Sequence, residues 1–211
     1  RSSKLAYVIP TSGSTGVPKL VAISHLSSTT FIAEWFQTVS HSAVPVTLVS
    51  SSFSFDMSVP LIFTPILYGG SAVVPPDIAD ISRLFELIVS MKVSHIIATP
   101  TVLSAMPVSS SFHVQSLILG GEALSYEALA RTRPFIRNCE IITNGYGPAE
   151  TTICSTAYVV SNIESHQTGP IPIGTPLRTH SVYVLDGGMK PVPVGFPGEL
   201  FIGGRCLARE Y

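Results

Sequence analysis

Short apolar runs alternate with longer amphipathic segments through most of the chain. The apolar runs predict strands over residues 5–9, 20–23, 46–49, 71–74, 95–98, 117–119 and 140–143. The amphipathic segments predict helices over residues 26–38, 57–67, 81–91 and 126–136. Strands that alternate with helices favour an α/β fold with a mostly parallel sheet covered by helices on both faces.

The clearest helical signal covers residues 81–91, where apolar side chains recur at positions 81, 84, 85, 88 and 89. Either Asp80 or Ser82 has a side chain that can cap its first turn. Between the predicted elements, Gly69-Gly70 and Pro75-Pro76 indicate turns.

The pattern changes after residue 151, where no strong helical stripe follows. Apolar runs at 181–185 and 199–202 flank the turn residues Asp186-Gly187-Gly188, which is typical of a hairpin. We therefore expect an α/β subdomain over residues 1–151 and a smaller β-rich portion, a partial barrel, over residues 152–211. The chain runs to Tyr211 without a turn or a polar tail, so we expect this second portion to be incomplete at its C-terminus.

Composition narrows the range of functions. The 211 residues are 45% hydrophobic and only 12% charged, with a net charge of −1, so bulk electrostatics favour neither nucleic acid nor an anionic membrane. No apolar run reaches the ~18 residues of a membrane span, and no signal peptide is visible. The three cysteines lie far apart, so their spacing suits neither a zinc site nor a disulfide framework, and we expect a cytoplasmic location.

Residues 11–19, Thr-Ser-Gly-Ser-Thr-Gly-Val-Pro-Lys, form the richest chemical motif of the chain. Glycines let backbone N–H groups turn toward an anion, hydroxyls add donors, and lysine adds a positive charge. The P-loop motif does not fit, because Val17 and Pro18 separate Gly16 from Lys19 and Leu20 follows where a hydroxyl is required. We predict a phosphate-binding loop, and a flexible surface linker is the alternative.

Three further segments follow predicted strands, where ligands bind in open α/β sheets. Asp56, between aromatic residues, is either the cap of the helix over 57–67 or a carboxylate that pairs with a substrate ammonium. The segment 120–123 begins with two glycines that permit close backbone approach to a flat ligand, or simply form a turn. In the segment 144–151, Tyr146 has glycine neighbours that leave its ring open for stacking, and Glu150 is a candidate Mg²⁺ ligand.

Taken in order, these segments resemble the adenylation domains of non-ribosomal peptide synthetases, within the superfamily that also contains acyl-CoA synthetases and luciferases. The resemblance covers essentially the whole chain, and it rests on four motifs at residues 5–7 with 11–19, 55–58, 144–150, and 198–204 with 207–209. It implies an enzyme, an ATP-dependent ligase that joins an amino-acid carboxylate to AMP. The acyl group then passes to the phosphopantetheine thiol of a carrier domain.

The resemblance also implies a role for each motif. The residues expected to hold ATP are Thr11, Ser12, Gly13, Ser14, Thr15, Gly16, Lys19, Gly121, Glu122, Ala123, Asn144, Tyr146 and Gly147. Glu150 would bind Mg²⁺. Asp56 would bind the α-amino group, and the expected pocket for the side chain is formed by Met57, Pro60, Ile97, Ile118, Gly120, Gly145, Ile153 and Cys154. No residue of this pocket is charged and its two glycines leave room, so an apolar and fairly large side chain is the expected guest.

The chain also departs from the family pattern. Ala149 replaces the usual threonine before Glu150, which removes a hydroxyl worth about 1.5–3 kcal/mol if it contacts a charged phosphate. The family's catalytic lysine lies in a C-terminal subdomain beyond this sequence, so no catalytic residue is assigned here. We expect a core fragment with little activity by itself. An acyl- or aryl-CoA ligase and an inactive ligand-binding scaffold are the alternative functions.

Overall fold

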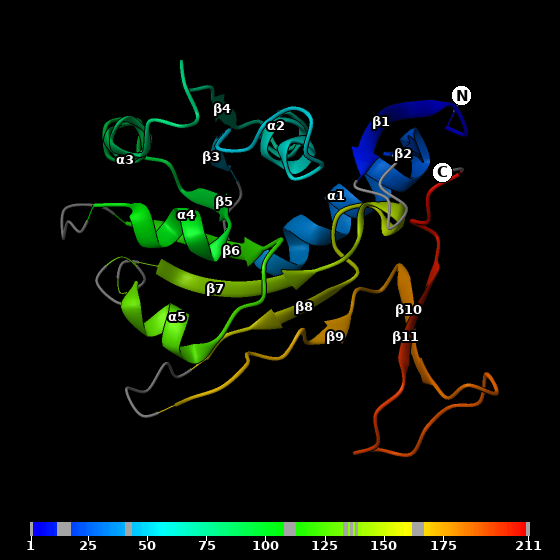
Figure 1. Ribbon diagram of the computed structural model, residues 1–211. Coiled ribbons are helices and arrows are strands. Elements are labelled where there is room, and N and C mark those ends of the chain that lie inside the picture. Colours follow the sequence, from blue (N-terminus) through cyan, green and yellow to red (C-terminus); the bar gives the residue numbers. More distant parts are fainter. Residues whose placement is uncertain are drawn as a thin grey trace.

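A seven-stranded sheet with the order β4-β3-β5-β6-β7-β8-β9 forms the centre of the molecule (Figure 1). The computed structural model describes residues 2–11, 18–40, 44–107, 113–132, 135, 137, 139–161 and 167–209. The strands of this sheet are β3 (Val46–Leu48), β4 (Ser71–Val73), β5 (His95–Ala98), β6 (Val114–Gly120), β7 (Cys139–Tyr146), β8 (Thr156–Val159) and β9 (Thr175–Pro176). Pairing is parallel from β4 to β7 and antiparallel from β7 to β9, which confirms the predicted α/β class.

Helices cover both faces of the sheet. On one face lie α1 (His25–Val39) and α2 (Ser58–Leu67), and on the other lie α3 (Ile81–Ser90), α4 (Pro100–Ala105) and α5 (Tyr126–Arg131). The sequence pattern predicts all of these except α4, whose six residues are too few to show a helical stripe. That helix is defined instead by its start, where the Thr99 hydroxyl accepts a hydrogen bond from the Val102 amide and Pro100 occupies the first turn.

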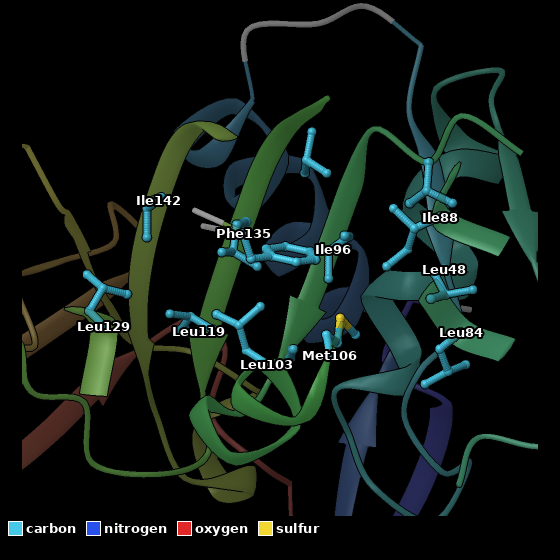
Figure 2. Packing of buried hydrophobic residues seen from close by; sticks show 14 of the residues in the cluster. Leu48, Leu84, Ile88, Ile96, Leu103, Met106, Leu119, Leu129, Phe135 and Ile142 are labelled. Carbon is cyan, nitrogen blue, oxygen red and sulfur yellow. The ribbon is translucent and has the colours of Figure 1, made fainter. Parts of the chain in front are cut away.

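The larger core lies between the sheet and the helices α3, α4 and α5 (Figure 2). Strand residues such as Leu48, Ile96 and Leu119 are buried there against Leu84 of α3 and Leu103 of α4. Figure 2 shows these side chains spread across one face of the sheet. A sheet that is packed on both faces is a rigid support for the loops that leave its carboxyl edge.

The N-terminus of α3 offers a first test of the sequence analysis. Its cap is Asp80, whose Oδ1 accepts a hydrogen bond from the Arg83 amide at 2.9 Å. Replacing Asp80 with alanine is expected to lower the free energy of unfolding by ~1 kcal/mol, because one amide of the first turn loses its partner. Urea denaturation measures the loss, and Ser82→Ala, the other candidate cap, is the control and should change stability by far less.

Two antiparallel hairpins lie outside the central sheet. They are formed by β1 (Leu5–Thr11) with β2 (Lys19–Ser24), and by β10 (His180–Leu185) with β11 (Glu199–Gly204). The sequence pattern predicts a boundary at residue 151, whereas β8 and β9 lie beyond that residue and extend the central sheet. The change to hairpin patterning therefore begins within the sheet, because antiparallel edge strands carry the same sequence signature as a separate β-rich unit.

The last described residues return to the start of the chain. The Arg209 amide donates to the Ala22 carbonyl of β2, and the Ala208 amide donates to the Glu150 carbonyl. Figure 1 shows both ends of the chain beside β1 and β2. Across the described part of the chain, no helix combines the length and apolar character needed to span a bilayer.

Candidate functional site

The carboxyl ends of the parallel strands bring together three of the four predicted segments. Strand β6 ends at Gly120, β7 ends at Tyr146, and Asp56 follows β3 in the chain. In the ladder between β6 and β7, Gly120 lies opposite Gly145, so the two glycine-containing segments leave the sheet side by side. This is the edge at which open α/β sheets bind ligands.

A pocket of about 450 Å³ opens at this edge. Its walls contain six of the residues predicted to hold the nucleotide, namely Gly121, Glu122, Ala123, Asn144, Tyr146 and Gly147. Gly121 has a φ of +78°, which glycine adopts without strain and which turns the backbone along the pocket wall. The side chain of Tyr146 is 39% exposed, so its ring is accessible at the pocket's edge.

The opposite wall comes from residues 170–173, which the sequence analysis did not assign to the site. Pro170, Ile171 and Ile173 line the pocket. The Asn144 amide nitrogen donates to the Pro172 carbonyl at 2.9 Å, and the Ile171 amide donates to the Leu124 carbonyl at 2.9 Å. Asn144 therefore positions this wall. In the sequence, the wall is marked only by the turn-forming pair Gly169-Pro170.

Glu122 connects the pocket to α4 through hydrogen bonds. Its carboxylate accepts hydrogen bonds from both the amide and the hydroxyl of Thr101, in the first turn of α4. Slight desolvation raises the pKa of Glu122, but hydrogen bonds from Thr101 and Thr99 outweigh it and leave the pKa lowered. An ionised Glu122 thus fixes the start of the loop that follows β6.

Asp56 is buried, with 7% of its surface exposed. It does not cap α2, because Met57 precedes the helix and no side chain caps it. The pKa of Asp56 is raised to about 6: burial is the main cause and the nearby Glu150 carboxylate adds to it, while hydrogen bonds from the backbone of Met57 and of Asp56 itself oppose the rise. Of the two interpretations of Asp56, the geometry excludes the helix cap.

The phenol of Tyr7 lies in the same buried region. Its hydroxyl is buried and has no hydrogen-bond partner within the described residues. Burial is the main cause that raises the pKa of Tyr7, and the negative charge of Asp56 adds to this effect. A buried hydroxyl beside a buried carboxylate makes this corner of the site polar but incompletely satisfied, which is suited to a cationic ligand.

Glu150 lies in the single turn of 3₁₀-helix η1 (Ala149–Thr151), directly after β7. Within the described part of the chain, no three His, Cys, Asp or Glu side chains cluster as a metal site. Mg²⁺ in nucleotide sites uses one or two carboxylates together with phosphate oxygens, so a single glutamate fits that donor set.

Strained backbone follows Glu150. Thr152 and Ile153, both β-branched, have φ values of 61° and 74°, in the left-handed region that such residues rarely adopt. The Thr152 hydroxyl donates to the Cys206 carbonyl at 2.5 Å, which anchors this conformation from a distant part of the chain. The two residues turn the chain from η1 back toward the buried face where Cys154 lies.

The predicted phosphate loop joins the two strands of the first hairpin. Thr11 and Lys19 face each other at the end of the β1–β2 ladder. Ser12, Gly13, Ser14, Thr15 and Gly16 lie outside the described residues, so their role stays a prediction. Strand β2 contacts η1, so the base of this loop is close to the turn that carries Glu150.

The predicted side-chain pocket forms part of the second core cluster, beneath α1 and α2. Met57, Ile97, Ile118, Ile153 and Cys154 are all buried in it. Pro60 is also buried. The cluster includes Trp35 of α1, which the sequence analysis did not assign to the site. The expectation that Gly120 and Gly145 leave room is corrected by the structure. The Gly145 carbonyl and Met57 fill the space beside Gly120, and Trp35 and Cys154 fill the space beside Gly145.

Comparison with known proteins agrees with this geometry. Residues 1–211 match the family model described as AMP-binding enzyme. One of the linear gramicidin synthase proteins of Brevibacillus parabrevis is 38% identical over 209 residues, which cover 98% of this chain and 4% of that protein.

Two solved structures share the fold. A holo four-domain nonribosomal peptide synthetase bound to AMP and glycine has a TM-score of 0.81 and 28% identity, over 98% of this chain and 15% of that one. The Vibrio cholerae adenylation domain AlmE, in complex with glycyl-adenosine-5'-phosphate, has a TM-score of 0.83 and 25% identity, over 99% and 41%. The chain thus spans less than half of each of these relatives. Over its whole length, the chain belongs to the AMP-binding enzyme family.

Proposed function

We propose that this chain is the core of an adenylation domain that activates an α-amino acid with ATP. The amino-acid carboxylate attacks the α-phosphorus of ATP, a new P–O bond forms, and the bond to the bridging oxygen breaks to release pyrophosphate. The observation that carries the proposal is the buried Asp56 carboxylate, which lies within electrostatic range of Glu150 at the edge that also forms the large pocket.

The nucleotide is proposed to bind in the 450 Å³ pocket. Tyr146 would stack on the adenine, and the backbone of 121–123 would follow the edge of the base. Thr11, Lys19 and the loop between them would hold the β- and γ-phosphates, and Mg²⁺ on Glu150 would neutralise phosphate charge. Such chemistry depends mainly on positioning and on charge stabilisation at phosphorus.

The amino acid is proposed to bind through its ammonium group to Asp56. A buried carboxylate without a countercharge is costly, and an ammonium both neutralises it and relieves its repulsion from Glu150. An aryl- or acyl-CoA ligase has no use for this carboxylate, so its burial favours amino-acid activation over that alternative. The two solved relatives named above, which hold glycine or glycyl-adenylate, support the same choice.

The carrier domain, its phosphopantetheine thiol and the C-terminal subdomain belong to this proposal as partners in the complete protein, with a cytoplasmic location. The peptide synthetases to which the chain is similar are multidomain proteins of which it covers a small part. An inactive scaffold is the remaining alternative, and only activity separates it from the enzyme.

Amino-acid-dependent exchange of pyrophosphate into ATP by the complete adenylation domain tests the proposal. Tyr146→Ala is expected to weaken AMP binding to the 211-residue chain by about 5-fold to 150-fold, because base stacking contributes ~1–3 kcal/mol. Titration calorimetry measures this, and Tyr183→Ala, on the distant β10 hairpin, is the control that keeps wild-type affinity. Nucleotide binding without exchange for any amino acid would instead favour the scaffold.

A further inference from the structure

Trp35 occupies the space that Gly145 leaves empty. A β-carbon placed on Gly145 would lie 2.9 Å from Cη2 of the Trp35 indole and 3.1 Å from Sγ of Cys154. The indole is therefore packed directly on the backbone of β7, where a ligand side chain would otherwise lie. The missing side chain at Gly145 therefore makes room for the Trp35 indole and not for a substrate side chain.

The space beside the second glycine is filled in the same way. A β-carbon on Gly120 would lie 2.8 Å from the Gly145 carbonyl oxygen and 3.3 Å from Cε of Met57. The methionine therefore closes the part of the pocket that faces β6. At both glycines, the space into which an added side chain would project is therefore occupied.

Beneath α1 and α2 lies a void of about 20 Å³. Its walls are formed by residues that include Trp35 and three of the predicted substrate contacts, Pro60, Ile97 and Ile118. A void of this size holds about one water molecule. It accepts a hydrogen atom or a methyl group, and a leucine or phenylalanine side chain is several times too large.

Trp35 is also fixed in place. Its side chain is 3% exposed, and its ring stacks on Phe31 with 5.6 Å between ring centroids. The neighbouring Glu34 anchors this part of α1, because its carboxylate accepts hydrogen bonds from the amides of Arg178 and Thr179. Moving the indole to admit a larger ligand would disturb all of these contacts.

We infer that the substrate is an α-amino acid whose side chain is no larger than a methyl group, glycine or alanine, and that Trp35 sets this limit. The inference rests on the proposed function and deepens it. It replaces the large apolar side chain that the sequence alone predicts, because the composition of the pocket is apolar but its volume is occupied.

Pyrophosphate exchange with glycine, L-alanine, L-leucine and L-phenylalanine tests the inference on the complete adenylation domain. We expect kcat/KM for glycine or alanine to exceed that for phenylalanine by more than about 100-fold, since a packed wall rejects a larger side chain. Trp35→Ala is expected to lower the ratio of kcat/KM for glycine or alanine to kcat/KM for leucine or phenylalanine at least tenfold, mainly by raising kcat/KM for the larger amino acids. Trp35→Leu, which keeps more core volume, is the second variant in case the alanine variant does not fold.

Ile32→Ala is the matched control, because Ile32 is buried in the same helix and the same cluster but does not line the void. It should lose stability without changing substrate preference. A direct readout is also available in the 211-residue chain, since Trp35 is its single tryptophan. Glycine added in the presence of AMP should change the indole fluorescence, whereas phenylalanine at the same concentration should not.

The outcomes separate this inference from the proposed function. Exchange that prefers leucine or phenylalanine in the wild type overturns the size limit and leaves amino-acid activation intact. An unchanged preference in both Trp35 variants overturns the role of the tryptophan. Exchange with none of the amino acids overturns the proposed function and the inference with it.

Discussion

Replacing Asp56 with asparagine is expected to make the folded chain more stable at neutral pH while removing amino-acid activation by the complete adenylation domain. Burial is the main reason that the pKa of Asp56 rises from 3.8 to about 6. At pH 7 the folded protein must therefore hold an ionised carboxylate in an unfavourable place. Asparagine removes that charge, and the expected gain is ~3 kcal/mol in the free energy of unfolding.

The sign of the pH dependence follows from the raised pKa. The folded state holds its Asp56 proton to higher pH than the unfolded state, so this group makes stability fall as pH rises from about 4 to 6. The gain from Asp56→Asn should therefore be absent below pH 3.8, grow across this interval and be complete above it. Urea denaturation at pH 3.5, 5 and 7.5 measures the profile. Asp77→Asn, at an exposed aspartate, is the control.

The functional cost of the same substitution is expected to be large. Removing one partner of a buried charge pair costs ~3–5 kcal/mol, which lowers kcat/KM for amino-acid activation by a factor of ~10²–10³ or more. We therefore expect Asp56→Asn to combine a higher free energy of unfolding with a loss of amino-acid activation. Unchanged activity in Asp56→Asn would show that the ammonium binds elsewhere and would favour the acyl- or aryl-acid ligase.

Gly147→Ala is expected to damage both the fold and the nucleotide pocket. A β-carbon on Gly147 would lie 2.7 Å from Cα of Cys154 and from the amide nitrogen of Ser155. These are backbone atoms that cannot rotate away, and the Ser155 amide donates to the Tyr146 carbonyl at 2.7 Å. We expect a loss of ~1–3 kcal/mol in the free energy of unfolding, with displacement of Tyr146 and weaker AMP binding.

Urea denaturation and AMP titration calorimetry measure the two effects in the same samples. Gly203→Ala is the control, because no atom lies within 4 Å of the β-carbon that it would add. Its stability and affinity should match the wild type. Equal behaviour of the two variants would mean that the turn after β7 adapts without cost and does not fix the ring of Tyr146.

Much of the fold follows from local sequence. The apolar stripe of residues 81–91 and the Asp80 side chain define α3 almost to the residue, because periodicity and capping act within one helix. The boundary predicted at residue 151 does not coincide with the end of the sheet, since β8 and β9 join it through partners distant in the chain. Local patterning shows that a strand exists, but its place in a sheet depends on long-range pairing.

The candidate site divides in the same way. The segments that carry Asp56, Gly121 and Tyr146 could be predicted from the sequence because each follows a predicted strand. In an α/β sheet, the carboxyl ends of parallel strands lie at one edge, which brings such segments together. The wall formed by residues 170–173 could not be placed in the pocket from sequence, because long-range hydrogen bonds hold it there: Asn144 donates to the Pro172 carbonyl and the Ile171 amide donates to the Leu124 carbonyl.

The sequence by itself determined the class of fold, the order of the motifs and the chemical character of the site, since these depend on residue type and spacing. Only the tertiary structure decided how much room the site has and how its charges behave. Trp35 lies 110 positions before Gly145 in the chain yet fills the space beside it. Burial gives Asp56 its raised pKa. Volume and desolvation are properties of packed neighbours, and packing is set by the whole fold.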